Sequence, residues 1–273
     1  MKKYIVLSVN DNPDYLYYTP LTCWAWRKFG WEPILFYNGD LSKLSEIRLL
    51  CTEKDWIGTA FWLDKHNDYR DDTITQISRL YGSCVADGYL MTGDIDMIPL
   101  SDYWKPDLNS FTVWGHDLTG HRNYPICYIG APTLLWNRVM NIGFNEDFNS
   151  LIKRDLDSLP QAKSNDWYKY WETDQDHITA RLKAYGTGNI NFITRGQGKH
   201  GFARGRVDRG NGGAGWVLDQ PELIDAHMLQ QTHHRQEKVN KLMELLYHVW
   251  PEGNFDWFES YTKEFRKLDN KND

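Results

Sequence analysis

Apolar runs alternate with stretches of helical periodicity from the start of the chain. Residues 4–9 form an apolar run that ends at a polar turn, a pattern typical of a strand buried on both faces of a parallel sheet. Residues 17–29 have apolar positions at helical spacing, Gly30 follows as a C-cap, and residues 33–37 form a second apolar run. Strand, helix and strand in this order predict an open α/β fold, in which ligands bind past the carboxyl ends of the strands.

The same alternation continues along the chain. Apolar runs predict further strands at residues 59–63, 89–91, 110–115, 125–132 and 189–194. Helical periodicity predicts helices over residues 41–50, 73–86 and 133–142, a helix capped by Thr173 or Asp174, and one after residue 235 that packs on the sheet. Residues 145–167 are polar and are expected to form a surface excursion. We therefore predict an α/β fold with a Rossmann-like, mostly parallel central sheet flanked by helices.

The predicted elements fill one domain, residues 1–265, followed by a charged tail at residues 266–273 that is expected to fray. No Gly-x-Gly-x-x-Gly follows the first strand, so the dinucleotide fingerprint is missing. A different mode of phosphate binding is favoured.

Two carboxylates follow the apolar run at residues 89–91. Gly93 allows a turn, and Asp94 and Asp96 come next, two residues apart. In extended chain, residues i and i+2 point to the same side, so both side chains are expected to project together from the strand end. Paired carboxylates are hard ligands that suit Mg²⁺ or Mn²⁺. The sequence therefore predicts a divalent metal site here, and two solvated loop carboxylates are the alternative.

Charge and composition narrow the range of partners. The 273 residues carry 31 Lys and Arg against 37 Asp and Glu, and a net charge of −6 makes nucleic acid an unlikely partner. The aromatic content of 15%, with 13 Trp, fits sugar-stacking surfaces. No window approaches 18 apolar residues, so we expect no integral membrane segment, and a cytoplasmic setting. Four scattered cysteines suggest neither a zinc site nor a disulfide framework.

About eighty residues after Asp96 comes the run Asp174-Gln175-Asp176. The apolar strand with Asp94-x-Asp96, followed by this second motif, resembles the A-type (GT-A) glycosyltransferases, and within them the glycogenin and lipopolysaccharide galactosyltransferase group. The resemblance implies transfer of a sugar from a UDP- or GDP-sugar to a glycan or other hydroxyl acceptor, with retention. It also implies Asp174, Gln175 and Asp176 as catalytic residues.

The resemblance implies binding residues as well. His227 lies where that group often completes the metal shell, so Asp94, Asp96 and His227 would make an O,O,N set that favours Mn²⁺ over Mg²⁺, with His233, His234 and His200 as rivals. The residues expected to hold the nucleotide sugar lie at two strand ends, near the metal motif and on basic segments: Val9, Asn10, Tyr37, Arg79, Ile95 and Lys199, with Asp94 and Asp96.

Several alternatives remain open. Arg79 either approaches the diphosphate or is a surface residue. The basic, glycine-rich residues 195–213 form either a lid over an anionic group or a mobile loop. His116 and Asp117 are either turn residues or catalysts. For the whole protein, the rival functions are a non-catalytic carbohydrate-binding protein and a phosphatase that uses the first Asp of Asp-x-Asp as nucleophile.

Overall fold

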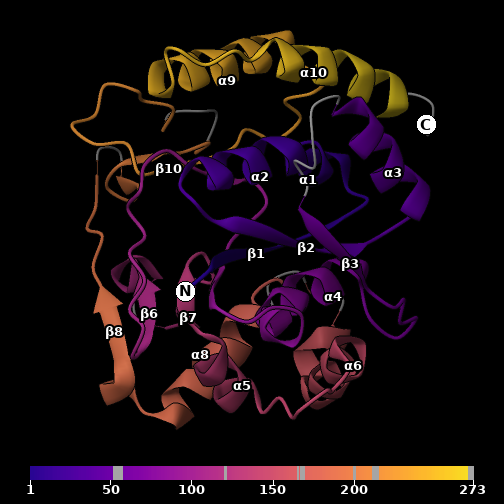
Figure 1. The fold of residues 1–273 in the computed structure, drawn as a ribbon, viewed down its shortest axis with the longest axis vertical. Helices are drawn as coiled ribbons and strands as arrows, with labels where there is room; N and C mark the ends of the chain where they lie inside the picture. Colours follow the sequence, from indigo (N-terminus) through magenta and orange to yellow (C-terminus); the bar gives the residue numbers. More distant parts are fainter. Residues whose placement is uncertain are drawn as a thin grey trace.

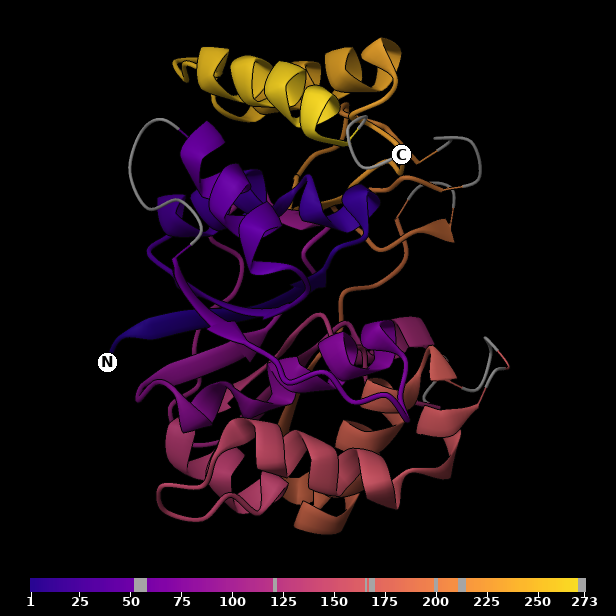
Figure 2. The same cartoon turned by 90° about the vertical axis from the view of Figure 1, so that its right-hand side faces the viewer.

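The computed structural model describes residues 1–51, 58–119, 122–164, 166, 170–198, 201–210 and 215–269. A central sheet has a helical layer on each face, and a further pair of helices lies outside one of these layers (Figures 1 and 2). The predicted α/β class, with a mostly parallel sheet between helices, is confirmed.

In the described part of the chain, the main sheet has seven strands in the order β3-β2-β1-β4-β7-β6-β8. β7 runs antiparallel to β4 and β6, and the other neighbouring pairs are parallel. The bounds are β1 Lys3–Asn10, β2 Glu32–Asn38, β3 Thr59–Trp62, β4 Tyr89–Thr92, β6 Phe111–Trp114, β7 Ile129–Pro132 and β8 Ile190–Ile193. Strand order changes direction between β1 and β4, and in open α/β sheets this is where ligands bind.

Helices cover both faces of the sheet (Figure 1). On one side lie α1 Pro13–Leu16, α2 Thr19–Lys28 and α3 Leu41–Leu50. On the other lie α4 Asp71–Ser78, α5 Thr133–Met140, α6 Phe148–Ser158 and α8 Thr173–Tyr185, with the 3₁₀ turn η1 Arg79–Cys84 continuing α4. The remaining 3₁₀ turns are η2 His116–Thr119, η3 Pro160–Lys163 and η4 Thr187–Asn189. No helix in the described ranges is long and apolar enough to cross a bilayer.

The alternation of β1 divides the core into two. Ile5, Leu7 and Val9 point into the cluster on the α2 side, whereas Val6 points into the cluster shared with α4, α5 and α6. All four side chains are at most 1% exposed. The apolar run at the start of the sequence therefore stabilises both layers, as expected for a strand at the centre of the sheet.

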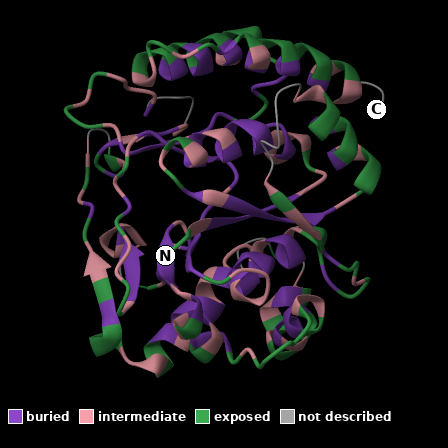
Figure 3. Ribbon diagram, in the orientation of Figure 1, coloured by how far each residue is buried: buried purple, intermediate pink, exposed green. Residues whose placement is uncertain are grey.

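The last two helices form the outer layer (Figures 1 and 3). α9 (Gln236–Val249) and α10 (Asp256–Asp269) lie over the layer of α1, α2 and α3, with α10 in contact with α3, and not on the sheet as predicted. Trp24 of α2 contacts Trp250 and Phe255 edge-on, at ring-centroid distances of 4.9 and 5.4 Å. α10 includes residues 266–269, the first four residues of the expected tail. Arg266 in this part of the helix donates a hydrogen bond to the carbonyl of His233, which holds it in place.

The prediction of a polar excursion over residues 145–167 is wrong for the part that α6 occupies, and residues 165 and 167 lie outside the described residues. Asp147 caps α6 by accepting a hydrogen bond from the Ser150 amide at 2.8 Å, and one face of the helix buries Leu151, Ile152 and Leu156. That face also carries Asp155, 2% exposed, which accepts hydrogen bonds from Tyr81, His177, Arg154 and Arg181 at 2.5 to 3.1 Å. Because the other face of α6 carries charged residues, the apolar positions of the helix were not recognised in the sequence.

A second, three-stranded sheet forms among the described residues, with β10 (Asp225–His227) between β5 (Met97–Pro99) and β9 (Arg206–Val207). β10 runs antiparallel to β5, so that His227 is opposite Met97. None of these three strands was predicted from the sequence. Each is only two or three residues long, and none has a periodic pattern of its own.

Replacing Asp155 tests the buried hydrogen bonds that this carboxylate accepts from Tyr81, His177, Arg154 and Arg181. Burial opposes ionisation of Asp155, but His177, Arg154 and Tyr81 outweigh it and hold its pKa well below the usual range. The depressed pKa means that this stabilisation is fully present above about pH 4, the unfolded-state value, and is lost as the pH falls towards the folded-state pKa. Asp155→Ala should therefore lower the unfolding free energy at pH 7 by about 3 kcal/mol.

The measurement is guanidinium denaturation at pH 7 and at pH 3, with Asp157→Asn, an exposed carboxylate on the same helix, as control. The control should change little. A loss for Asp155→Ala that is as large at pH 3 as at pH 7 would contradict the assignment.

Candidate functional site

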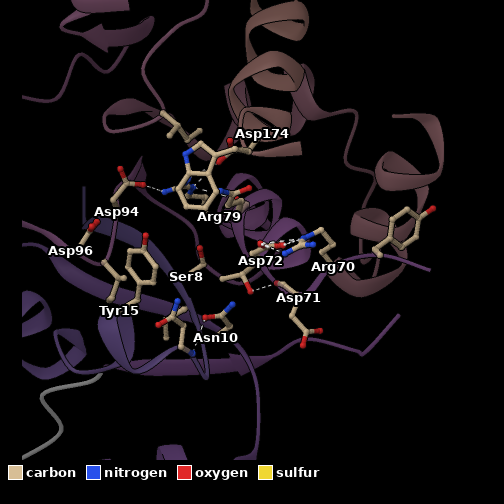
Figure 4. A pocket seen from close by; sticks show the side chains of 18 of the residues that line it. Ser8, Asn10, Tyr15, Arg70, Asp71, Asp72, Arg79, Asp94, Asp96 and Asp174 are labelled. Carbon is tan, nitrogen blue, oxygen red and sulfur yellow. Dashed lines mark hydrogen bonds and ion pairs between the residues drawn. The ribbon is translucent and has the colours of Figure 1, made fainter. Parts of the chain in front are cut away.

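A cavity of about 790 Å³ opens at the carboxyl ends of β1 and β4, where the strand order changes direction. Ser8, Val9 and Asn10 of β1 line one side, and Asp94 and Asp96 line another (Figure 4). Lys65, Arg70, Asp71 and Asp72 extend the lining before and into α4. The cavity is thus at the place that the open α/β fold predicts for a ligand.

Asp94 and Asp96 lie in a turn and not in extended chain. β4 ends at Thr92, and Gly93 packs so closely on β1 that an added Cβ would lie 2.9 Å from Ile5 Cδ1. The Met97 amide then donates to the Asp94 carbonyl at 3.1 Å, which closes the turn. Both carboxylates line the cavity, but the expectation that they point the same way is wrong. Asp94 faces Arg79, and Asp96 faces Arg209 and His227.

Arg79 is a buried bridge between two carboxylates (Figure 4). It lies where α4 tightens into η1, with its side chain 8% exposed. Nη1 donates to Asp94, while Nη2 and Nε donate to Asp174 Oδ2 at 2.6 and 3.1 Å. Burial acts to lower the pKa of Arg79, but the two carboxylates prevail and raise it, so the guanidinium stays charged. The alternative of a surface arginine is therefore wrong.

The pairing of β10 with β5 brings His227 to Asp96. His227 Nε2 lies 3.4 Å from Asp96 Oδ2, and its Nδ1 lies 3.5 Å from Asp208 Oδ2. Burial acts to lower the pKa of His227, yet Asp208 and Asp96 raise it to about 9. For Asp96, burial acts to raise the pKa, but His227 and Arg209 outweigh it and lower the pKa. Arg209 donates to Asp96 Oδ2 at 2.8 Å.

The donor chemistry of Asp94, Asp96 and His227 fits a divalent ion, because two carboxylates and one imidazole are the ligands that Mn²⁺ takes. Asp208 beside His227 Nδ1 supplies the carboxylate that commonly orients a metal-binding histidine. The three side chains are not preassembled, since Asp94 is held by Arg79. An ion at this site requires Asp94 and Asp96 to exchange their arginine partners for the metal.

The residues of the second predicted motif, Asp174-Gln175-Asp176, point in different directions because they lie on a helix. Asp174 and Gln175 in the first turn of α8 line the cavity, but Asp176 does not, and it accepts a hydrogen bond from Asn123 at 2.7 Å. Residues two apart on a helix point about 200° apart, which separates the two carboxylates. The N-cap is Glu172, so the predicted capping by Thr173 or Asp174 is wrong.

The remaining predicted binding residues separate in the same way. Val9, Asn10 and Ile95 line the cavity. Tyr37 does not, because its hydroxyl donates to Asp11 and to the Asp40 carbonyl at 2.9 Å. Lys199 lies outside the described residues, as does the rival ligand His200. The other rivals, His233 and His234, face Asp269 and not the cavity.

In the basic segment 195–213, one of the described arginines lines the cavity and the others do not. Arg195 and Arg206 both pair with Asp225, which is fully buried, at N···O distances of 2.6 and 3.0 Å. Asp117 accepts hydrogen bonds from the amides of Arg195 and Gly196 at 3.0 and 2.8 Å, and is thus a turn residue. Arg195 and Arg206 are therefore structural and not part of a lid, whereas Arg209 lines the cavity.

Sequence reasoning missed Tyr15, Trp171 and Asp208. Tyr15 and Trp171 line the cavity, and Asp208 contacts His227. Tyr15 lies in α1, the short helix that begins three residues after β1, so its position past a strand end was a signal that could have identified it. Asp208 had no such signal, since it meets His227 through the β9 and β10 pairing.

No protein-family model matches the chain, and no curated protein matches it by sequence. Solved structures do match. The glycosyltransferase GlyE of Streptococcus pneumoniae TIGR4 is 12% identical, with a TM-score of 0.50 over 98% of this chain and 64% of GlyE. An active-site mutant of LgtC is 16% identical, with a TM-score of 0.50 over 88% of this chain and 95% of LgtC.

The galactosyltransferase LgtC in complex with donor and acceptor sugar analogs is 15% identical, with a TM-score of 0.49, over 94% of this chain and 99% of that one. The two matches with a TM-score of 0.50 show that the chain shares the fold of these enzymes. The predicted GT-A fold is confirmed.

The Arg79 bridge generates a stability prediction. Arg79→Ala leaves Asp174, 1% exposed, as an unpaired buried carboxylate, which should lower the unfolding free energy by about 3 kcal/mol. Burial acts to raise the pKa of Asp174 and Arg79 opposes this, so the carboxylate depends on Arg79 to stay ionised. Adding Asp174→Asn to Arg79→Ala should restore part of the loss, as measured by denaturant unfolding.

Arg70→Ala serves as the control, because the Arg70–Asp72 pair is exposed and should contribute at most about 1 kcal/mol. If the double variant is less stable than Arg79→Ala alone, Arg79 and Asp174 are not coupled in this way.

Proposed function

We propose that this protein is a metal-dependent glycosyltransferase that moves a sugar from a UDP- or GDP-sugar to a hydroxyl of a glycan or another acceptor. The observation that carries the proposal is the position of Asp94 and Asp96. They lie in one turn after β4, inside the cavity at the sheet's switch point. A protein with the fold of known glycosyltransferases thus has paired carboxylates at the place where open α/β sheets bind their ligands.

The cavity offers separate surfaces for the parts of such a donor. Val9 and Asn10 at the end of β1 would hold the base and ribose, with the ring of Tyr15 beside them. Ile95 lies between the two carboxylates and would contact the ribose side. A volume of about 790 Å³ is in the range of pockets that enclose ligands of this size.

Charge is arranged for the diphosphate. Asp94, Asp96 and His227 would hold Mn²⁺, or Mg²⁺, which when bound supplies Lewis-acid stabilisation of the leaving diphosphate. Arg209 donates to Asp96 and is directed into the cavity. Once Asp96 has another cationic partner, the guanidinium of Arg209 is available to donate to phosphate oxygens.

We propose that transfer occurs with retention. Inversion needs a free carboxylate that accepts the proton of the acceptor hydroxyl. In the second motif, Asp174 is held by Arg79, and Asp176 faces Asn123 outside the cavity. Gln175 lines the cavity and has an amide that donates and accepts hydrogen bonds but is not a base. We assign Gln175 to contact the transferred sugar and Asp174 to position Arg79.

The rival functions have less support. A phosphatase of the Asp-x-Asp type carries the pair after its first strand, whereas here it follows β4, and the first Asp is paired with Arg79. A sugar-binding protein without catalysis does not explain a histidine placed between Asp96 and Asp208.

Calorimetric titration of UDP and of GDP, with and without Mn²⁺, tests the proposal. We expect one nucleotide to bind in a Mn²⁺-dependent manner, and Asp96→Ala to weaken this binding at least about a hundredfold, because the diphosphate loses its shared cation. Asp102→Ala, an exposed carboxylate outside the cavity, should bind as the wild type does. If neither nucleotide binds with Mn²⁺ present, the transferase proposal fails.

Replacing Arg209 should change the binding of Mn²⁺ and the binding of the nucleotide in opposite directions. Arg209→Ala removes the cation that competes for Asp96, so Mn²⁺ alone should bind more tightly, by about tenfold. The same change removes a donor to the diphosphate, so the nucleotide should bind more weakly in saturating Mn²⁺. Calorimetry of metal and nucleotide in turn measures both. Arg204→Ala, in the same loop but exposed and paired with Glu222, is the control. A change of the same sign in both titrations argues against this role.

A further inference from the structure

A second cluster of metal-binding side chains lies away from the cavity. Over the described residues, the group of three His, Cys, Asp or Glu side chains whose ligand atoms all lie within 4.8 Å of one another is His233, His234 and Asp269. The two histidines lie in the turn between β10 and α9, and Asp269 is the last residue of α10. The cluster therefore joins two segments that the sequence separates by 35 residues.

The distances fit a small tetrahedral ion. Asp269 Oδ2 lies 3.1 Å from His233 Nε2 and 3.2 Å from His234 Nε2. Ligands placed about 2.0 to 2.1 Å from a tetrahedral zinc ion lie about 3.3 Å from one another. The two distances from Asp269 are thus close to those in a tetrahedral zinc site, and all three ligand atoms lie within 4.8 Å of one another.

The surroundings hold one ligand rigid and leave another open to solvent. His233 is 1% exposed, and its ring contacts Tyr17 and Phe265 at centroid distances of 5.4 and 5.3 Å. His234 is 44% exposed. An ion here would have three protein ligands and a fourth position that water can reach.

The neighbouring charges also admit a cation. Two carboxylates lie near the cluster: Asp269 itself, and Asp14, which accepts a hydrogen bond at 2.7 Å from the amide of Gln231, two residues before His233. Arg266 is a cation close to the cluster. Its Nε donates to the backbone carbonyl of His233 and its Nη1 donates to Gln236 Oε1 at 3.1 Å, so these two groups bind neither imidazole.

We propose that His233, His234 and Asp269 bind Zn²⁺, at a site distinct from the cavity and independent of the proposed transferase activity. Two imidazoles and one carboxylate bind Zn²⁺ more tightly than Mn²⁺, according to the general order of affinities for divalent metals. The ion would fasten the end of α10 to the turn that follows β10. It would thereby brace the strand that carries His227, six residues before His233.

The test uses Asp96→Asn as background, which weakens any metal site in the cavity. Zn²⁺ is titrated by equilibrium dialysis, and Co²⁺ is added as a spectroscopic probe, because its visible absorption reports tetrahedral coordination. Asp96→Asn should bind one Zn²⁺ and show the tetrahedral Co²⁺ spectrum. Adding His234→Gln or Asp269→Asn should weaken Zn²⁺ binding at least tenfold and remove the spectrum.

His248→Gln, which replaces an exposed histidine on α9, is the matched control and should keep both signals. Zn²⁺ should raise the melting temperature of the background protein but not that of the His234→Gln variant. Because His234 is half exposed, this variant is expected to fold, and circular dichroism verifies it. Equal Zn²⁺ binding in all variants, or no tetrahedral Co²⁺ spectrum in the background protein, overturns the proposal.

Discussion

The site depends on one buried guanidinium. Arg79 neutralises Asp94 and Asp174, which come from opposite sides of the cavity, one after β4 and one on α8. Without it, Asp174, which is almost fully buried, would be an uncompensated charge in a low-dielectric environment. The turn that carries Asp94 and the first turn of α8, which carries Asp174, are thus joined by a single side chain at the start of η1.

The other half of the site depends on the small sheet. β10 pairs with β5 directly after the Asp96 turn, and the Met228 amide donates to the Asp96 carbonyl at 2.9 Å. This register places His227 against Asp96, although 130 residues separate them in sequence. The buried Asp225 at the start of the same strand is neutralised by Arg195 and Arg206, which ties these two residues of the basic segment to β10. Strand, loop and histidine are therefore positioned together.

Charge compensation also explains why Asp94 and Asp96, the proposed metal ligands, face different partners. Asp94 and Asp96 both need a positive partner, and Arg79 and Arg209 supply it from different directions. In this structure, each of the two carboxylates is paired with an arginine of the protein itself. A metal ion at Asp94 and Asp96 would take the place of the guanidiniums there, and the released guanidiniums would face the diphosphate. The charges would then stay balanced, which is the physical basis of the proposed function.

The sequence by itself determined the elements with strong patterns. The apolar runs of β1, β2 and β4, and Gly93 before the two aspartates, follow from burial on both faces and from a turn, which are local properties. The position of the cavity past these strand ends followed as well. Tertiary structure decided what depends on distant partners. The packing of α6 on the core, the burial of Arg79, and the separation of Asp174 from Asp176 by helix rotation all lay beyond local pattern. So did the pairing of His227 with Asp208, because its energy comes from contacts between segments that only the folded chain brings together.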